Sequence, residues 1–107
     1  MISKDTIDKV FEFSRVEEVI SDFIALKKSG ANYKGLSPFT NEKTPSFIVS
    51  PSKQIWKDFS SGKGGNVIAF LMEHEQFNYP ESIRYLANKY NIEIIETEET
   101  AENIEER

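Results

Sequence analysis

The residues best suited to chemistry lie in the segment IWKDFSSGKGGN, residues 55–66. It places three glycines and two lysines before a segment with helical spacing, and the N–H groups at the start of a helix bind phosphate and other anions. Neither common nucleotide loop fits. A Walker A loop needs Ser or Thr where this chain has Gly64, and a dinucleotide fingerprint needs glycine where it has Val67. A looser anion site remains, with Lys63 beside a helix start capped by Asn66.

The rest of the chain offers few groups for catalysis. Its 107 residues include no cysteine and a single histidine, His74, which we expect on a helix face rather than at a metal. Disulfides and thiolate metal sites are therefore excluded. We find no Ser-His-Asp set and no acidic cluster suited to catalytic Mg²⁺, so we predict no catalytic residue. Because no apolar run approaches the ~20 residues of a membrane span and the charged N-terminus lacks a signal-peptide core, we expect a cytoplasmic protein with no membrane partner.

Charge is unevenly distributed along the chain. The net charge is −5, yet residues 27–63 hold seven lysines and only two acidic residues. Residues 96–107, ETEETAENIEER, hold six glutamates and one arginine. A basic segment with interleaved aromatic residues is typical of a nucleic-acid-binding surface. Charge alone fits a solvated, lysine-rich sheet face equally well.

The apolar spacing predicts an α+β domain in which a small antiparallel β-sheet is flanked by N-terminal and C-terminal helices. Ser3 or Asp5 caps a first helix, Ser14 a short second one and Asn66 the helix after the glycines. Pro80 falls near the start of the last helix, where its missing N–H costs nothing. Short segments rich in β-formers predict strands at 33–36, 46–50 and 54–59, with 23–28 as a possible fourth and 92–95 as a possible last strand.

Several short sequence motifs in the middle of the chain occur together in one known family. NYKGL, EKTPSF, KQI and GKGGNV stand in an order and at spacings that resemble the N-terminal zinc-binding domain of bacterial DnaG-type DNA primases. The resemblance runs from Val10 to Ile95. It implies a zinc-ribbon-like fold and a template-binding domain over residues 1–95. Residues 96–107 are then an acidic linker or tail toward an RNA polymerase domain that is absent here.

The resemblance also reveals a departure at the metal site. The family holds zinc through C-x-x-H and C-x-x-C pairs, and the four matching positions here are Ser37, Thr40, Asp58 and Ser61. Hydroxyls and one carboxylate do not supply the soft or imidazole ligands of structural zinc. We therefore predict a zinc-ribbon fold without zinc, in which Asp58 accepts hydrogen bonds from the three hydroxyls. Because structural zinc contributes on the order of 10 kcal/mol to folding, we expect an enlarged core built from Phe39, Phe47, Ile48, Ile55, Trp56 and Phe59.

In the family, this domain engages single-stranded template, while a separate polymerase domain joins ribonucleotides with divalent metal. The resemblance thus implies a non-catalytic fragment of a primase that binds single-stranded DNA and helps to initiate RNA primer synthesis. No cofactor is expected in this fragment, and Mg²⁺ only in the missing polymerase domain. Single-stranded nucleic acid is held by basic grooves and aromatic stacking platforms. We expect that surface to be formed by Tyr33, Lys34, Lys43, Trp56, Lys57 and Lys63.

The resemblance implies two further partners, the polymerase domain and, through the full-length protein, the replicative helicase of the primosome at a bacterial replication fork. Two alternatives stay open. One is a non-enzymatic interaction module that docks on the polymerase domain or the helicase, and the other is a primase-like protein of a mobile element or phage. Salt-dependent binding of single-stranded DNA distinguishes template binding from the first alternative.

Overall fold

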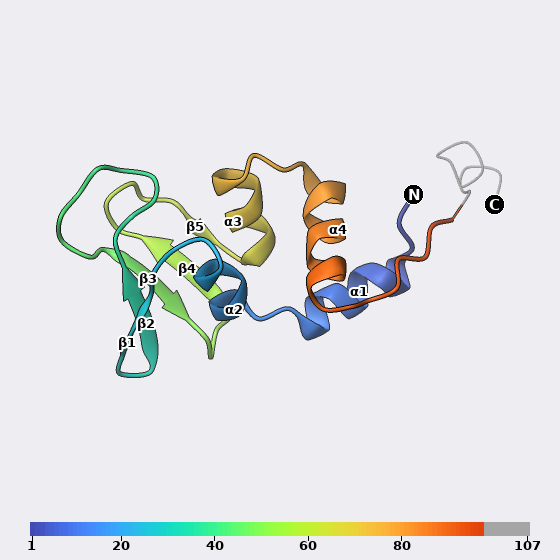
Figure 1. Ribbon diagram of the computed structural model, residues 1–107, viewed down its shortest axis with the longest axis horizontal. Helices are drawn as coiled ribbons and strands as arrows, with labels where there is room; N and C mark the ends of the chain where they lie inside the picture. Colours follow the sequence, from blue (N-terminus) through green and yellow to red (C-terminus); the bar gives the residue numbers. More distant parts are fainter. Residues whose placement is uncertain (98–107) are drawn as a thin grey trace.

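The computed structural model describes residues 1–97, which form four helices and a five-stranded antiparallel sheet (Figure 1). The strands lie in the sheet in their sequence order, from β1 to β5. Two helices precede the sheet and two follow it, so the predicted α+β class is confirmed. The elements are α1 (Lys4–Phe13), α2 (Val16–Ser21), β1 (Lys27–Ser29), β2 (Asn32–Gly35), β3 (Phe47–Ser50), β4 (Ile55–Asp58), β5 (Gly64–Gly65), α3 (Val67–His74) and α4 (Tyr79–Lys89).

Three of the helices begin where local chemistry predicts. The side chains of Ser3 before α1 and Asn66 before α3 each accept a hydrogen bond from the backbone N–H three residues further on. Helix α4 begins with a reciprocal pair, in which Asn78 and Glu81 each accept the other's backbone N–H. Pro80 lies in its first turn. These starts depend on residues close in sequence, which explains why the sequence predicts them.

The predicted cap of α2 is wrong. Ser14 ends α1 instead, and Arg15, at the position before α2, makes no side-chain cap. The cap comes from the β3–β4 turn, where Gln54 Oε1 accepts the backbone N–H of Val16 at 2.9 Å. The Gln54 amide also donates to Glu17 Oε1 at 3.0 Å. A residue distant in sequence thus satisfies the first free N–H of the helix.

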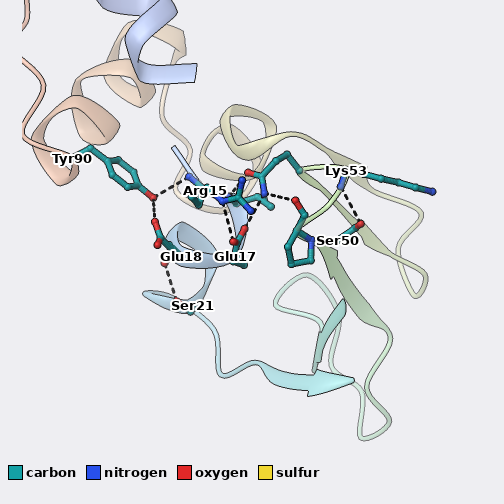
Figure 2. A network of polar contacts seen from close by, with 10 residues as sticks. Arg15, Glu17, Glu18, Ser21, Ser50, Lys53 and Tyr90 are labelled. Atoms are coloured by element: carbon teal, nitrogen blue, oxygen red, sulfur yellow. Dashed lines mark hydrogen bonds and ion pairs between the residues drawn. The ribbon is translucent and has the colours of Figure 1, made fainter. Parts of the chain in front are cut away.

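A continuous polar network fastens α2 to the end of α4 as well as to the sheet (Figure 2). The Tyr90 hydroxyl accepts the backbone N–H of Arg15 at 3.0 Å and donates to Glu18 at 2.7 Å. Burial, helped by the neighbouring Glu18 and Glu17 carboxylates, raises the pKa of Tyr90 to about 12, so it stays a donor near neutral pH. The sheet and the helical end of the molecule are therefore connected by specific bonds.

The sheet has one covered face and one open face. Residues paired directly across antiparallel strands share a face. Helices α2 and α3 pack against β3 and β4 on the inner face. The inner row is Lys28, Tyr33, Val49, Trp56 and Gly65, and the outer row is Lys27, Lys34, Ile48, Lys57 and Gly64.

An aromatic cluster fills the core between the sheet and α3. Trp56 is 1% exposed and stacks on Phe47, with ring centroids 5.5 Å apart and planes 19° apart. Its indole N–H donates to the backbone oxygen of Asn66 at 2.8 Å. Of the predicted enlarged core, Phe47 and Trp56 are confirmed as buried, and Phe39 packs against them. The prediction is wrong for Ile48, Ile55 and Phe59, whose side chains lie on the open face. Ile48 is half-buried there, and Ile55 and Phe59 are 43% and 68% exposed.

The C-terminal end of the described chain pairs with the N-terminus and not with the sheet. Residues 92–95, predicted as a possible last strand, are followed by a single bridge between Glu96 and Ile2. The edge next to β4 is taken by β5 instead. Of the predicted acidic linker, residues 98–107 lie outside the described residues, and the domain boundary stays a prediction. Among residues 1–97 no helix is long and apolar enough to cross a membrane.

Candidate functional site

The loops after β2 and β4 meet at a buried carboxylate, and we call these loops, residues 36–46 and 59–63, the knuckle. Asp58, at the end of β4, has no exposed surface. Its Oδ2 accepts the hydroxyls of Ser37 at 2.6 Å and Ser61 at 2.7 Å. Gly62 closes the second loop with φ +82°, and its N–H donates to the Asp58 carbonyl at 2.8 Å. Three of the four positions that the resemblance assigns to zinc ligands are therefore joined directly.

The second carboxylate oxygen is occupied by Ser60. Asp58 Oδ1 accepts the Ser60 hydroxyl at 2.7 Å and the Ser60 backbone N–H at 3.1 Å. Thr40 does not reach Asp58, and its hydroxyl lies 2.7 Å from Ser60 Oγ instead. The predicted network is thus confirmed for Ser37 and Ser61 and wrong for Thr40. Ser60 was missed because nothing in its local sequence distinguishes it from the neighbouring Ser61.

Ser37 is the centre from which the first loop folds. Its Oγ accepts the backbone N–H groups of Phe39 at 3.0 Å and Thr40 at 3.2 Å while its hydroxyl donates to Asp58. Its own N–H donates to Glu42 Oε2 at 3.0 Å. Both lone pairs and the proton of the Ser37 hydroxyl are used, so this side chain leaves no free capacity for another ligand.

The network favours an ionised carboxylate. Burial by itself would raise the pKa of Asp58, but the hydrogen bonds from Ser37, Ser61 and Ser60 outweigh burial and hold the pKa below its ordinary value. A buried charge is tolerable when donors surround it. Asp58 therefore supplies one fixed negative charge that several neutral donors share.

These residues do not fit a structural zinc ion. Zinc of this kind takes four sulfur or nitrogen ligands, with carboxylate as an occasional substitute. The chain has no cysteine. Residues 1–97 contain no group of three or more His, Cys, Asp or Glu side chains placed to hold a metal. Asp58 has both oxygens committed to hydroxyl and amide donors. The Glu42 carboxylate of the knuckle accepts the Ser37 N–H and the Ser46 hydroxyl through Oε2, so these groups satisfy one another without a metal.

The open face of the sheet carries a second group of candidate residues, which we call the outer face. In the row of cross-strand partners at its centre, Ile48 lies between Lys34, which pairs with Lys27, and Lys57. None of these three lysines forms an ion pair with another residue in the range 1–97. A shallow groove of about 300 Å³ runs over β3 and β4, lined in part by Ile48, Lys57 and Phe59.

The sequence-predicted binding residues do not all reach this face. Lys34 and Lys57 lie on it, and Lys43 is exposed on the knuckle. Tyr33 is half-buried on the inner face. Trp56 is fixed in the core, so the prediction that it stacks on bases is wrong, because its partners are Phe47 and the Asn66 carbonyl.

Lys63 has partners within the protein. Its Nζ lies 2.8 Å from Glu73 Oε2 and 5.7 Å from the centre of the Phe39 ring. These contacts draw the amine toward the side of α3, where a carboxylate neutralises it. Its availability to a phosphate is therefore lower than that of Lys27 and Lys34. Lys57 keeps its full charge, because its one partner is the neutral Gly62 carbonyl, at 3.1 Å.

Sequence reasoning missed four residues of the outer face, Lys27, Ile48, Ile55 and Phe59. The signal was present in the two-residue period of a strand, because burial of Trp56 and Asp58 forces their neighbours outward. The expected core took Ile55, Trp56 and Phe59 together, although neighbouring residues of a strand face opposite sides of the sheet.

A small antiparallel ribbon whose loops meet beside a helix defines a domain of the zinc-ribbon class. The CHC2 zinc finger family matches residues 2–102, which is most of the chain. The chain therefore belongs to the CHC2 zinc finger family.

Its relatives are DNA primases. The DNA primase of Clostridium acetobutylicum is 47% identical over 94 residues, which cover 88% of this chain and 16% of that primase. The DNA primase of Listeria monocytogenes is 45% identical over 93 residues, which cover 87% of this chain and 15% of the primase. The chain thus spans about a sixth of the length of these curated relatives.

A solved structure supports the same relationship. The crystal structure of the Aquifex aeolicus primase, containing zinc-binding and RNA polymerase domains, resembles this chain with a TM-score of 0.78 and 36% identity. The match covers 92% of this chain and 24% of that one. The fold is therefore that of a primase zinc-binding domain.

Proposed function

We propose that the chain is the template-binding domain of a DNA primase and helps to initiate RNA primer synthesis by holding single-stranded DNA on the outer face. The observation that carries the proposal is the row of Lys27, Lys34 and Lys57 beside the exposed rings and methyl groups of Phe59 and Ile55. Lysines that track a phosphate backbone next to a stacking platform are the usual means of holding single strands. Helices α2 and α3 cover the opposite face of the sheet, so the outer face stays accessible to single-stranded DNA.

The test is the salt dependence of single-strand binding. For single strands, log K falls against log salt with a slope of about −0.7 for each phosphate contact. We expect Lys57→Ala and Lys34→Ala each to weaken binding of a fluorescein-labelled oligothymidine and to reduce the slope by about 0.7. The matched control is Lys9→Ala, an exposed lysine of α1 away from the sheet. Salt-independent binding, or equal behaviour of all three variants, would refute the proposal.

We also propose that this domain folds without zinc and without any other cofactor. The support is the donor set of the knuckle, which is saturated by its own hydrogen bonds. In the full-length protein, Mg²⁺ belongs to the polymerase domain and the replicative helicase is a further partner, with the whole assembly in the bacterial cytoplasm.

A second candidate function, docking on the polymerase domain, has its own support at the other end of the molecule. An apolar groove of about 610 Å³ lies between α1 and α4, with Ile2, Ile7, Tyr79 and Ile83 among its walls. It lies beside Thr97, whose backbone pairs with Met1 at the end of the described chain. Ile7→Ser, which makes this groove polar, is expected to weaken binding to a separately supplied polymerase domain and to leave oligonucleotide binding unchanged.

A further inference from the structure

A pocket of about 600 Å³ opens at the margin of the outer face, next to the knuckle. Its walls come from the α2–β1 connection, the loop after β2 and the end of α3, and they are mostly apolar. Phe23 and His74 supply two rings whose centroids lie 5.6 Å apart. His74 is itself stacked on Phe70, at 5.0 Å and 12°, so this part of the wall is held in place by the core.

Of the other apolar wall residues, Ile24 packs against the core, whereas Leu36 and two prolines form the outer part of the wall. Leu36 is 47% exposed although it follows a buried glycine, and Pro38 and Pro45 line the same space. The backbone here is closely packed, because a side chain at Gly35 would lie 2.7 Å from the Ala25 carbonyl. The pocket therefore presents fixed apolar surface to solvent at a place where folding does not require it.

Three lysines give the rim of the pocket a positive charge. Lys27, Lys34 and Lys43 line it, and none of them is ion-paired within the described part of the chain. Lys27 and Lys34 are cross-strand partners and also belong to the central row of the outer face. A ligand that follows this row thus arrives at the pocket with its negative charges already beside lysines.

We propose that the pocket takes one unstacked base of the single-stranded DNA, with the flanking phosphates held by Lys27, Lys34 and Lys43. A base has flat apolar faces that suit rings and prolines, and it is joined to anionic groups that suit lysines at the rim. An acidic peptide with an apolar anchor has similar overall chemistry, but the continuity of the lysine row from the outer face into the pocket favours a polyanion lying across the sheet. The inference rests on the proposed function and adds a defined place for one base.

Two variants of the whole chain test the inference by affinity. Ala25→Leu places added bulk in the pocket from an exposed position, and Ala31→Leu places the same bulk in the β1–β2 turn, away from the pocket. We expect Ala25→Leu to weaken oligothymidine binding roughly ten-fold, as the loss of one base contact does. Ala31→Leu should bind as the wild type does. Matching thermal unfolding of the two variants confirms that the difference does not come from folding.

Nuclear Overhauser contacts between thymine methyl protons and methyl-labelled protein locate the base directly. Contacts to Leu36 and Ala25 are expected. Contacts confined to Ile48 and Ile55, with Ala25→Leu binding normally, would overturn the pocket and leave the outer face standing. If the thymine methyl protons show no contact with the protein and binding does not depend on salt, the base-binding proposal and the proposed function both fail. If only an acidic, leucine-containing peptide contacts Leu36, the pocket is a protein-docking site and the inference fails.

Discussion

Replacement of Asp58 by asparagine separates the charge of the knuckle from its shape. The introduced amide has almost the same volume, but it presents an NH₂ group in place of one carboxylate oxygen. If the NH₂ replaces Oδ2, it faces Ser37 Oγ, which already accepts two backbone N–H groups and has no lone pair left. If it replaces Oδ1, it faces the Ser60 backbone N–H, a donor against a donor. Either orientation leaves buried groups unsatisfied.

The size of the effect follows from the bonds that are lost. Four donors approach Asp58 at 2.6 to 3.1 Å. A hydrogen bond to a charged group contributes about 1.5–3 kcal/mol to stability. Ser61 is exposed and its hydroxyl is free to rotate, so part of the network rearranges. We expect Asp58→Asn to lower the free energy of unfolding by about 3 kcal/mol, the equivalent of one to two such bonds.

Urea unfolding followed by Trp56 fluorescence measures this change. Trp56 is the only tryptophan and lies buried two residues from Asp58, so its emission reports on the same part of the fold. The control is Asp8→Asn on the exposed side of α1, which removes an identical charge and is expected to change stability by less than about 0.5 kcal/mol.

A double-mutant cycle with Ser61→Ala shows whether the loss arises from this bond. We expect a coupling between the two substitutions of about 1 kcal/mol, because they remove the same hydrogen bond. If Asp58→Asn is no more destabilising than Asp8→Asn, or if the cycle shows no coupling, the carboxylate does not hold the knuckle together and the reasoning is refuted.

The same carboxylate gives stability a defined pH dependence. Its pKa in the folded protein is below the ordinary value of 3.8, so its contribution is complete above about pH 5 and is lost as pH falls through 3.8 toward the lower folded pKa. Acid titration of the unfolding free energy should therefore fall more steeply for the wild type than for Asp58→Asn, and parallel curves would contradict the assignment. At the α2 cap, Gln54→Ala should cost about 2 kcal/mol through the lost bonds to Val16 and Glu17. Because Gln54 has φ 56°, Gln54→Gly should cost about 1 kcal/mol less than Gln54→Ala. Equal urea midpoints for the two variants would show that this backbone conformation carries no strain.

The sequence predicts those parts of the fold that depend on neighbours in the chain. Ser3, Asn66 and Pro80 act within one helical turn of their own positions, and their roles can be derived from spacing. The prediction that Ser14 caps α2 is wrong, because the cap is Gln54, which lies 38 residues from Val16 in the sequence. No local pattern contains that information.

The phase of β4 explains what was predicted wrongly at the candidate site. Trp56 and Phe59 are both aromatic residues in a strand with alternating faces, and either phase is consistent with composition. Trp56 and Asp58 are both buried and share one face of β4, which places Ile55 and Phe59 on the other face and removes Trp56 from the predicted binding surface. The position of Asp58 itself followed from the resemblance, which assigns it to the position of a zinc ligand.

Native mass spectrometry of the purified chain, expressed in zinc-containing medium, tests the central claim most directly. We predict the mass of the polypeptide alone, together with urea midpoints that are identical with and without a strong chelator. One zinc ion per chain, or a loss of stability in the chelator, would contradict the proposal that Asp58 and its serine hydroxyls hold the knuckle in place of a metal.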